Sequence, residues 1–271
     1  MRVTIYQPQY FPRLHYYNRI IDSDTFVILD STQYTKALTH LDDDRRHKSY
    51  QSDTPIKIAI GEFLLTVPIK HQGLLPINQT KIDYNQNWAR RHLLILKSAY
   101  AKSAYFKLIY PQLVQILSTK YDNLATLNIN TILWGIAYIS GAEIDIAQLS
   151  IDSVNTKLAK NKIIRLKKII TDKDIGIARP PGAKKGTQWT ANICKALGAT
   201  EYFHGETAKK GYMELDHYKN LGISPIVQNW TCSTYSQQFI LKIPFLPNLS
   251  IIDLLFNVGG SSALEIILSR K

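Results

Sequence analysis

The sequence predicts an α/β fold in which an open, mostly parallel β-sheet is combined with a helical middle segment. Three observations support this prediction. Short apolar runs alternate with helix-like segments near both ends of the chain, which is typical of parallel sheets with crossover helices. Polar loops directly follow several of these runs. Residues 88–141 instead carry apolar side chains at a spacing close to 3.6 residues, which indicates consecutive helices.

The first forty residues have the pattern of strand, loop, helix and strand. The apolar run 1–5 is followed by the polar and aromatic loop 6–12, by a helix-like segment at 14–21 and by a second apolar run at 25–29. In open α/β sheets, binding sites lie beyond the carboxyl ends of the strands. We therefore expect a site where the loop meets the residues that follow the second run.

The later elements follow from periodicity and turn residues. The amphipathic stretch 158–170 predicts a helix, whose basic face is either solvated or a docking face for an acidic partner. Ser250 with Asp253 predicts a capping box at the start of a helix. The pair Gly61-Glu62 predicts a tight hairpin turn. The other expected elements are strands at 56–60, 63–69, 201–205 and 225–227, and helices at 189–197, 215–221 and 251–257.

The expected organisation is one compact unit in three parts. The chain has 271 residues, of which 45% are apolar, enough for a large core. The parts are an N-terminal α/β part at 1–87, a helical segment at 88–141 and a C-terminal α/β part at 142–271.

The composition also bears on the cellular location of the protein and on metal binding. No apolar run approaches the roughly 20 residues of a membrane span, so no membrane insertion is expected. The start of the chain lacks the apolar segment of a signal peptide. Cys194 and Cys232 form no metal-spaced pair, and no other metal-site spacing is present. We therefore expect a cytoplasmic protein without a bound metal.

The formal net charge of +12 suggests an anionic partner. Nucleic acid, an acidic membrane surface, a phosphorylated small molecule and an acidic carrier protein are all candidates. A merely soluble basic surface is the alternative. No nucleic-acid-binding motif accompanies the charge, so nucleic acid is an unfavoured partner.

The loop after the first run is the first candidate site. Gln7, Gln9 and Tyr10 offer amide and hydroxyl groups, and Pro8 and Pro12 stiffen the loop. Such a loop suits recognition of a sugar or a base, and the alternative is a structural turn that buries its aromatic rings.

The residues after the second run are the next candidates. Asp30 could act as a base toward an amine or hold a hydroxyl group, together with Gln33 and Tyr34, and the alternative is a turn cap. His92 lies four residues after Trp88 on one helical face, as a general base or as a core histidine.

Two basic segments could bind phosphate. Arg45 and Arg46 lie in a polar stretch, where they could clamp a diphosphate or pair with neighbouring aspartates. The glycine-bounded loop 205–212 carries Lys210 and Tyr212 after an expected strand. It is not a Walker motif.

Several motifs in chain order resemble the WbqC-like family. They are Tyr6-Gln7-Pro8-Gln9-Tyr10-Phe11-Pro12, the run from Asp24 to Asp30, Gln33-Tyr34, 65–68, Trp88, His92, Tyr100, Tyr105-Phe106, Tyr235 with Gln237, and 245–259. The family usually begins His-Gln-Pro, where this chain has Tyr6. It usually has Trp-Leu-Gly-Tyr, where this chain has Arg13-Leu-His-Tyr. The resemblance implies work on activated sugars in surface-polysaccharide, O-antigen and lipopolysaccharide biosynthesis, with Tyr235 and Gln237 among the binding residues.

A second likeness is to the fold of nucleotidyltransferase-like adenylating enzymes, with Rossmann-like strand order. In those enzymes, imidazoles at the first helix hold the triphosphate, and His15 stands in that region here. A packing role for His15 is the alternative, because the paired histidines of those enzymes are absent.

Together these features lead to one functional expectation and two alternatives. We expect a transferase that forms an amide on a nucleotide-activated amino sugar from an acyl or aminoacyl thioester, with Asp30 or His92 as the base and no cofactor. One alternative is a nucleotidyl-transfer ligase that uses ATP-Mg. The other is a non-catalytic module that binds a sugar nucleotide or nucleic acid.

Overall fold

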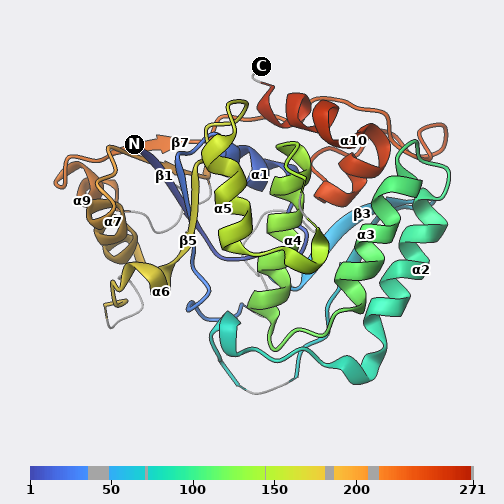
Figure 1. Ribbon diagram of the computed structural model, residues 1–271, viewed down its shortest axis with the longest axis horizontal. Helices are drawn as coiled ribbons and strands as arrows, with labels where there is room; N and C mark the ends of the chain where they lie inside the picture. Colours follow the sequence, from blue (N-terminus) through green and yellow to red (C-terminus); the bar gives the residue numbers. More distant parts are fainter. Residues whose placement is uncertain (36–48, 71–72, 144, 181–185, 207–213, 270–271) are drawn as a thin grey trace.

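The computed structural model describes residues 1–35, 49–70, 73–143, 145–180, 186–206 and 214–269, and Figure 1 shows their arrangement. A five-stranded parallel sheet and a separate antiparallel hairpin form the β-structure of this part of the chain. The expected division into three parts stays a prediction, although the sheet takes strands from both the first and the third part.

The parallel sheet has the predicted Rossmann-like order. Its strands in chain order are β1 (Arg2–Tyr6), β2 (Thr25–Ile28), β5 (Lys168–Thr171), β6 (Glu201–His204) and β7 (Ser224–Val227). Their spatial order is β5-β2-β1-β6-β7, and every neighbouring pair is parallel. The chain therefore builds the sheet outward on one side of β1 and then on the other, so a ligand-binding crevice is expected between β1 and β6. The predicted fold class is confirmed.

Both faces of this sheet are buried. Val3, Ile5 and Val27 belong to a smaller core that also contains Trp189. Phe26 and other residues of the opposite face belong to the larger core. Burial on both faces explains why the strands are short uninterrupted apolar runs rather than alternating ones.

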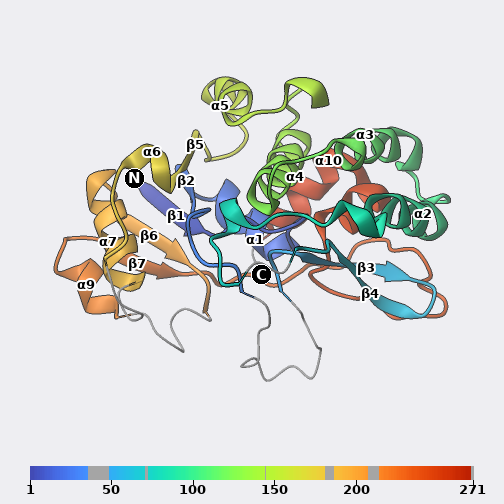
Figure 2. The ribbon, with the colours of Figure 1, turned by 90° about the horizontal axis from the view of Figure 1, so that it is seen from below.

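The helices are distributed unevenly around the parallel sheet. They are α1 (Leu14–Ile21), α2 (Trp88–Tyr100), α3 (Phe106–Ser118), α4 (Leu124–Ile139), α5 (Ile151–Lys160), α6 (Asp172–Ile175), α7 (Gly186–Ala196), α9 (Leu215–Lys219) and α10 (Ile251–Leu268). Figure 2 shows α7 and α9 near β6 and β7 and α6 near β5, with α2, α3 and α4 toward the opposite end of the molecule. The helical middle segment is therefore confirmed as α2 to α4.

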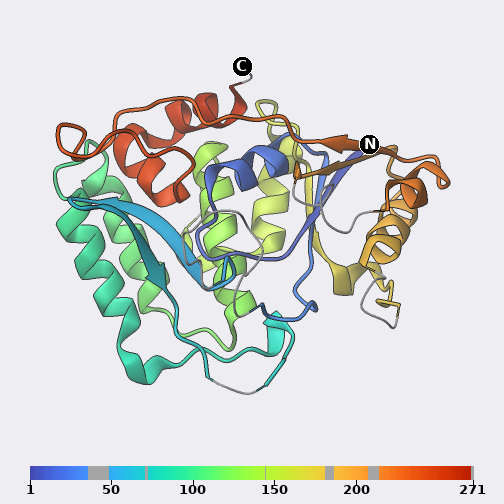
Figure 3. The same cartoon turned by 180° about the vertical axis from the view of Figure 1, so that it is seen from behind.

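The hairpin differs from its prediction by two residues. Strands β3 (Asp53–Ile58) and β4 (Gly61–Thr66) pair so that Ile58 faces Gly61, which makes Ala59 and Ile60 the turn. Gly61 instead begins β4 with a φ of 124°, a conformation that glycine adopts without steric strain. Figure 3 shows the hairpin beside α2 and α3.

The predicted helix at 158–170 is wrong from residue 161 onward. Helix α5 ends at Lys160, and residues from Lys168 form β5 beside β2. The Asn155 side chain bonds the backbone N–H and C=O of Ile169, which joins the strand to the helix. Leu158 and Leu166 are both buried. Their spacing along the chain also fits one face of a single helix, which explains the wrong prediction.

The end of the chain was also partly mispredicted. The expected helix begins after Ser250 as predicted and is interrupted by a kink at Gly259, with a φ of 75°, two residues after its expected end. A second helical stretch then continues to Leu268, and Asp253 does not complete a capping box. Its carboxyl instead accepts hydrogen bonds from tyrosines of other segments. By length and composition α10 could span a membrane, yet 61% of that stretch is buried, as in the core helix of a folded protein.

The loop after β1 is held from several directions. Phe11 has a φ of 37°, in the left-handed region that disfavours bulky residues. Its carbonyl accepts hydrogen bonds from Thr54 Oγ1 at 2.6 Å and Ser250 Oγ at 3.0 Å, and its N–H donates to Thr131 Oγ1 at 3.1 Å. Asn128 Nδ2 donates to the carbonyls of Pro8 and Gln51 at 3.0 and 2.7 Å.

Asn128→Ala should lower the free energy of unfolding by about 2–4 kcal/mol, because it leaves two buried carbonyls without donors. Urea denaturation followed by circular dichroism measures this value. Asn130→Ala, on the same helix with a local bond to Thr126, is the matched control and should change it by less than about 0.5 kcal/mol. Equal effects of the two substitutions would contradict the role given to Asn128.

Candidate functional site

The polar residues predicted after β1 and β2 lie at one edge of the sheet. Tyr6 pairs with Ile28, and the N–H of Leu29 donates to the Tyr6 carbonyl at 2.8 Å. Gln7 and Asp30 therefore leave neighbouring strands at the same carboxyl edge, as expected. The structure adds Asp172, which follows β5 on the other side of β2.

Asp30 and Asp172 form a pair of carboxyl groups. Asn78 Nδ2 donates to Asp30 Oδ1 at 3.2 Å, and Ser31 Oγ donates to Asp172 Oδ2. Burial, the negative charge of Asp172 and a hydrogen bond with its carboxyl together raise the pKa of Asp30 to about 6, while the hydrogen bond from Asn78 opposes the shift. Among the described residues, no lysine, arginine or histidine forms an ion pair with either carboxyl. A carboxyl group that titrates near neutral pH is suited to accept a proton from a substrate.

Sequence reasoning missed Asp172 for an identifiable reason. It follows the run Ile169-Ile170-Thr171, which has the β-branched composition of a buried strand. Because the preceding residues were predicted as a helix, the carboxylate after them was not placed at a strand end.

Gln7 belongs to a chain of amides. Gln51 Nε2 donates to Gln7 Oε1 at 2.7 Å, and Gln51 Oε1 accepts from the N–H of Thr35 at 2.8 Å. Gln51 therefore links Thr35, the last described residue before the segment 36–48, to Gln7. Arg45 and Arg46 lie within that segment, outside the described residues, so their phosphate-binding role stays a prediction. Gln9 is half-buried in the same loop.

Gln33 and Tyr34 diverge after β2. Gln33 is exposed, whereas Tyr34 is buried and its hydroxyl lies 2.9 Å from Ser52 Oγ. Gln33 is therefore accessible to a ligand, and Tyr34 connects the edge of the sheet to the start of β3.

Tyr10 and His92 bond to each other inside the core. The Tyr10 hydroxyl lies 3.0 Å from His92 Nδ1, and His92 Nε2 lies 3.1 Å from the Thr66 carbonyl. A carbonyl can only accept, so Nε2 carries the proton and Nδ1 accepts from Tyr10. Burial lowers the pKa of His92 to about 4, so the ring is neutral at pH 7. This geometry favours the core histidine, and the general-base role stays a prediction.

His15 also has a lowered basicity. Its Nδ1 lies 3.1 Å from Asn248 Oδ1, and burial together with the Arg19 and Arg13 guanidinium groups lowers the pKa to about 3. An imidazole that is neutral at pH 7 adds no charge for a phosphate.

Tyr235 and Gln237 lie in a buried network around Asp253. The Tyr235 and Tyr100 hydroxyls donate to its carboxyl at 2.7 and 2.6 Å, and burial raises its pKa. Gln237 Oε1 accepts from the buried Lys57 ammonium at 3.2 Å. The hydrogen bonds that the structure describes for Tyr235 and Gln237 run to this network and to Leu246, and none reaches the carboxyl edge of the sheet.

Tyr6, Arg19 and Gly205 pack together beyond the ends of β1 and β6. The Tyr6 hydroxyl accepts from the N–H of Gly205 at 2.9 Å, and the Arg19 guanidinium lies 4.0 Å from the centre of the Tyr6 ring. A Cβ at Gly205 would lie 2.1 Å from Arg19 Nη1, so any other residue there would displace the Arg19 side chain. Lys210 and Tyr212 follow in the chain, outside the described residues.

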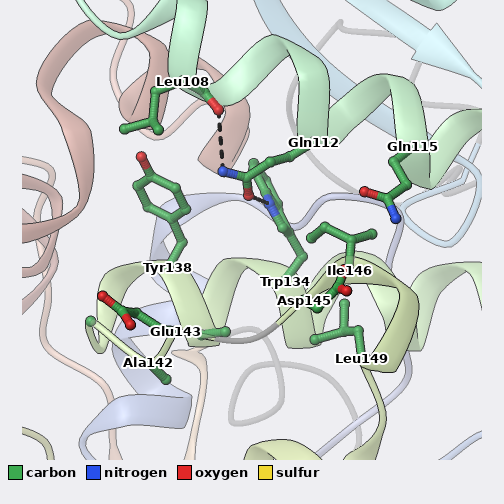
Figure 4. A pocket seen from close by; sticks show the side chains of 12 residues that line it. Leu108, Gln112, Gln115, Trp134, Tyr138, Ala142, Glu143, Asp145, Ile146 and Leu149 are labelled. Atoms are coloured by element: carbon green, nitrogen blue, oxygen red, sulfur yellow. Dashed lines mark hydrogen bonds between the residues drawn. The ribbon is translucent and has the colours of Figure 1, made fainter.

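A hollow in the surface lies away from the carboxyl edge of the sheet. A depression of about 740 Å³ is lined by α3, α4 and the segment 141–149 (Figure 4). Its wall includes Trp134, whose Nε1 donates to Gln112 Oε1 at 2.8 Å, and Tyr138. None of the predicted site residues lines it.

The fold and the site define an α/β protein with a polar site at the carboxyl edge of a Rossmann-ordered parallel sheet. The chain belongs to the WbqC-like protein family, whose sequence profile matches residues 7–265. It is 29% identical over 264 residues to the uncharacterized protein Rv1507c of Mycobacterium tuberculosis, covering 96% of this chain and 95% of that protein. No solved structure gives a significant match.

Asp30→Asn should stabilise the protein at neutral pH. Because the pKa of Asp30 is raised to about 6, the folded state binds a proton that the unfolded state has lost between about pH 4 and 6. The free energy of unfolding therefore falls as the pH rises through this window. Removing the charge should restore about 1–2 kcal/mol at pH 7, allowing for solvent screening of a half-buried group, and almost nothing at pH 4.

Urea denaturation at pH 4, 5, 6 and 7 measures this difference. Asp122→Asn, at an exposed position, is the control and should follow the native protein at every pH. If Asp30→Asn and the native protein lose stability in parallel between pH 4 and 6, the carboxyl pair does not exist in solution.

Proposed function

We propose that the protein forms an amide on the amino group of a nucleotide-activated sugar, using an acyl or aminoacyl thioester that is free or bound to a carrier protein. Surface-polysaccharide biosynthesis is the setting, including O-antigen and lipopolysaccharide assembly. Membership of the WbqC-like family supports this class of substrate, and it is compatible with an enzyme. The observation that carries the proposal is the Asp30–Asp172 carboxyl pair at the edge of the sheet.

The reaction needs a base near neutral pH. A sugar ammonium must first lose one proton to solvent, so that its nitrogen can attack the thioester carbonyl. The attacking nitrogen then loses a second proton, which Asp30, with a pKa of about 6, can accept and pass to the sulfur when the carbon–sulfur bond breaks. The negative charge of Asp172 disfavours the ionised form of Asp30. It thereby raises the pKa of Asp30 and makes this carboxylate a stronger base. The products are the amide and a thiol.

The loops next to the carboxyl pair are proposed to bind the substrate. Gln7, Gln9 and Gln33 present amides that can bond sugar hydroxyls and the tetrahedral oxyanion. Tyr10, Tyr34, Tyr235 and Gln237 are buried, and in this proposal they support the surrounding fold. Arg45, Arg46, Lys210 and Tyr212 are proposed to bind the diphosphate, because they follow Thr35 and Gly205 in the chain, and these two described residues bond to Gln51 and Tyr6.

No cofactor is required for this chemistry, and cytoplasmic nucleotide sugars are the proposed substrates. The remaining role for His15 in this proposal is to position α1 through Asn248.

A second candidate is a ligase that activates the acyl group with ATP-Mg by nucleotidyl transfer. The strand order favours it, because sheets of this order bind nucleotides where the order reverses, which is between β1 and β6 here. Pyrophosphate release that depends on the acyl acid separates the ligase from the thioester-dependent transferase.

Asp30→Asn should lower the turnover of amide formation by a factor of about 10²–10⁴, the usual contribution of a general base. His92→Gln should retain most of the activity, because its amide can replace the bonds to Tyr10 and Thr66. Turnover is measured by mass spectrometry with UDP-amino sugars and acyl thioesters, after the unfolding curves show that both variants fold.

The reverse result would assign the base to His92: a fully active Asp30→Asn and an inactive, folded His92→Gln. Asp172→Asn is the control within the carboxyl pair. It should move the acidic limb of the pH–rate profile to lower pH, because Asp30 then loses the carboxyl that raises its pKa.

A further inference from the structure

Half of the net charge of the protein is concentrated in a short segment. Residues 157–173 hold seven basic residues and one acidic residue, a net charge of +6 out of +12 for the whole chain. The seven are Lys157, Lys160, Lys162, Arg165, Lys167, Lys168 and Lys173, and all are exposed. The segment covers the end of α5, the connection to β5 and the first residues of α6. Figures 1 and 2 show α5 on the outside of the molecule.

Little of this charge is neutralised locally. Arg165 pairs with Asp24 at 2.9 Å, and Lys167 donates to the backbone carbonyls of Asn161 and Ile164. In the part of the chain that the structure describes, the other lysines of the segment form no ion pair. We call Lys157, Lys160, Lys162, Ile163 and Lys167 the basic face.

The basic face includes one exposed aliphatic side chain. Ile163 is 66% exposed, whereas the adjacent Ile164 is 4% exposed. The exposure of one isoleucine among four lysines is the pattern of a protein-docking surface with an apolar centre and a charged rim.

The backbone under the basic face is fixed before any partner arrives. Asn161 Oδ1 accepts from the N–H groups of Ile163 and Ile164 at 2.8 and 3.1 Å, and its Nδ2 donates to the Ser140 carbonyl at 3.0 Å. Leu158 and Ile164 are anchored in the core. A preformed surface loses little conformational entropy on binding.

The chemistry of the basic face favours an acidic protein over other anions. Residues 157–173 include no aromatic side chain on which a base could stack. The apolar side of α5 is turned inward, since Val154 and Leu158 are buried, so it cannot enter a membrane. An acidic helix with an exposed aliphatic side chain would complement both the lysines and Ile163.

The length of β5 separates the basic face from the Asp30–Asp172 carboxyl pair. The basic face adjoins the start of β5, and Asp172 follows the end of that strand. Four strand residues span about 13 Å at roughly 3.3 Å each. A flexible arm attached to a docked protein could therefore carry a reactive group to the carboxyl pair.

We propose that the basic face docks an acidic carrier protein, which, resting on the function proposed above, delivers the acyl thioester. The probe is an acylated acyl carrier protein, titrated by calorimetry at about 0.05 and 0.15 M salt. Replacing Lys157, Lys160 and Lys162 by Glu should weaken binding roughly ten- to a hundredfold, because the attraction becomes repulsion. Ile163→Ser should weaken it less and without changing the salt dependence.

The matched control reverses three equally exposed lysines of the α2–α3 region, Lys97, Lys102 and Lys107. It should leave carrier binding within about twofold of the native protein, since these lysines lie outside the basic face. Equal loss in both triple variants would mean a general charge attraction and overturn the proposal. So would tighter binding of a single-stranded RNA or of anionic vesicles than of the carrier at 0.15 M salt.

Transfer assays separate this proposal from the function on which it rests. The basic-face variant should raise KM for the carrier-bound thioester and leave turnover of a small N-acetylcysteamine thioester unchanged. Carrier binding without transfer from either donor would refute the proposed function and leave the docking surface supported. Transfer from the small thioester with no carrier binding would refute the docking surface alone.

Discussion

The structure depends on the clamp around the Phe11 carbonyl. A phenylalanine at a φ of 37° costs on the order of 1–3 kcal/mol, and hydrogen bonds from β3 and from the start of α10 hold it there. Helix α4 bonds the same loop through Thr131. Segments far apart in the chain therefore meet at one peptide, which fixes where the loop leaves β1 and hence where Gln7 lies.

The two edges of the sheet are electrostatically different. At the amino edge, Arg2 pairs with Asp22 and Glu201, and Arg165 pairs with Asp24, so each of these carboxylates has an arginine partner. At the carboxyl edge, Asp30 faces another carboxyl, and in the described part of the chain no cation forms an ion pair with it. Paired charge stabilises one edge, whereas the carboxyl pair at the other lowers stability and creates a proton acceptor.

Burial separates the residues that the family motifs contain into two groups. Tyr10, His92, Tyr235 and Gln237 satisfy one another or their neighbours inside the protein, as the bonds to Asp253 and Thr66 show. Gln7, Gln33 and Asp30 stay at the edge, where a ligand can reach them. A family motif thus marks both the residues of a site and those that hold it in place, and sequence alone does not distinguish them.

The sequence by itself determined the fold class, the helical middle segment and the shared edge of Gln7 and Asp30, because these follow from local periodicity and from the rule for parallel strands. It did not determine that Lys168–Thr171 is a strand, since amphipathic spacing fits both a helix and a buried strand beside one. Only the tertiary structure decided that Asp172 lies against Asp30 and that His92 is enclosed, because pairing and burial depend on residues far apart in the chain.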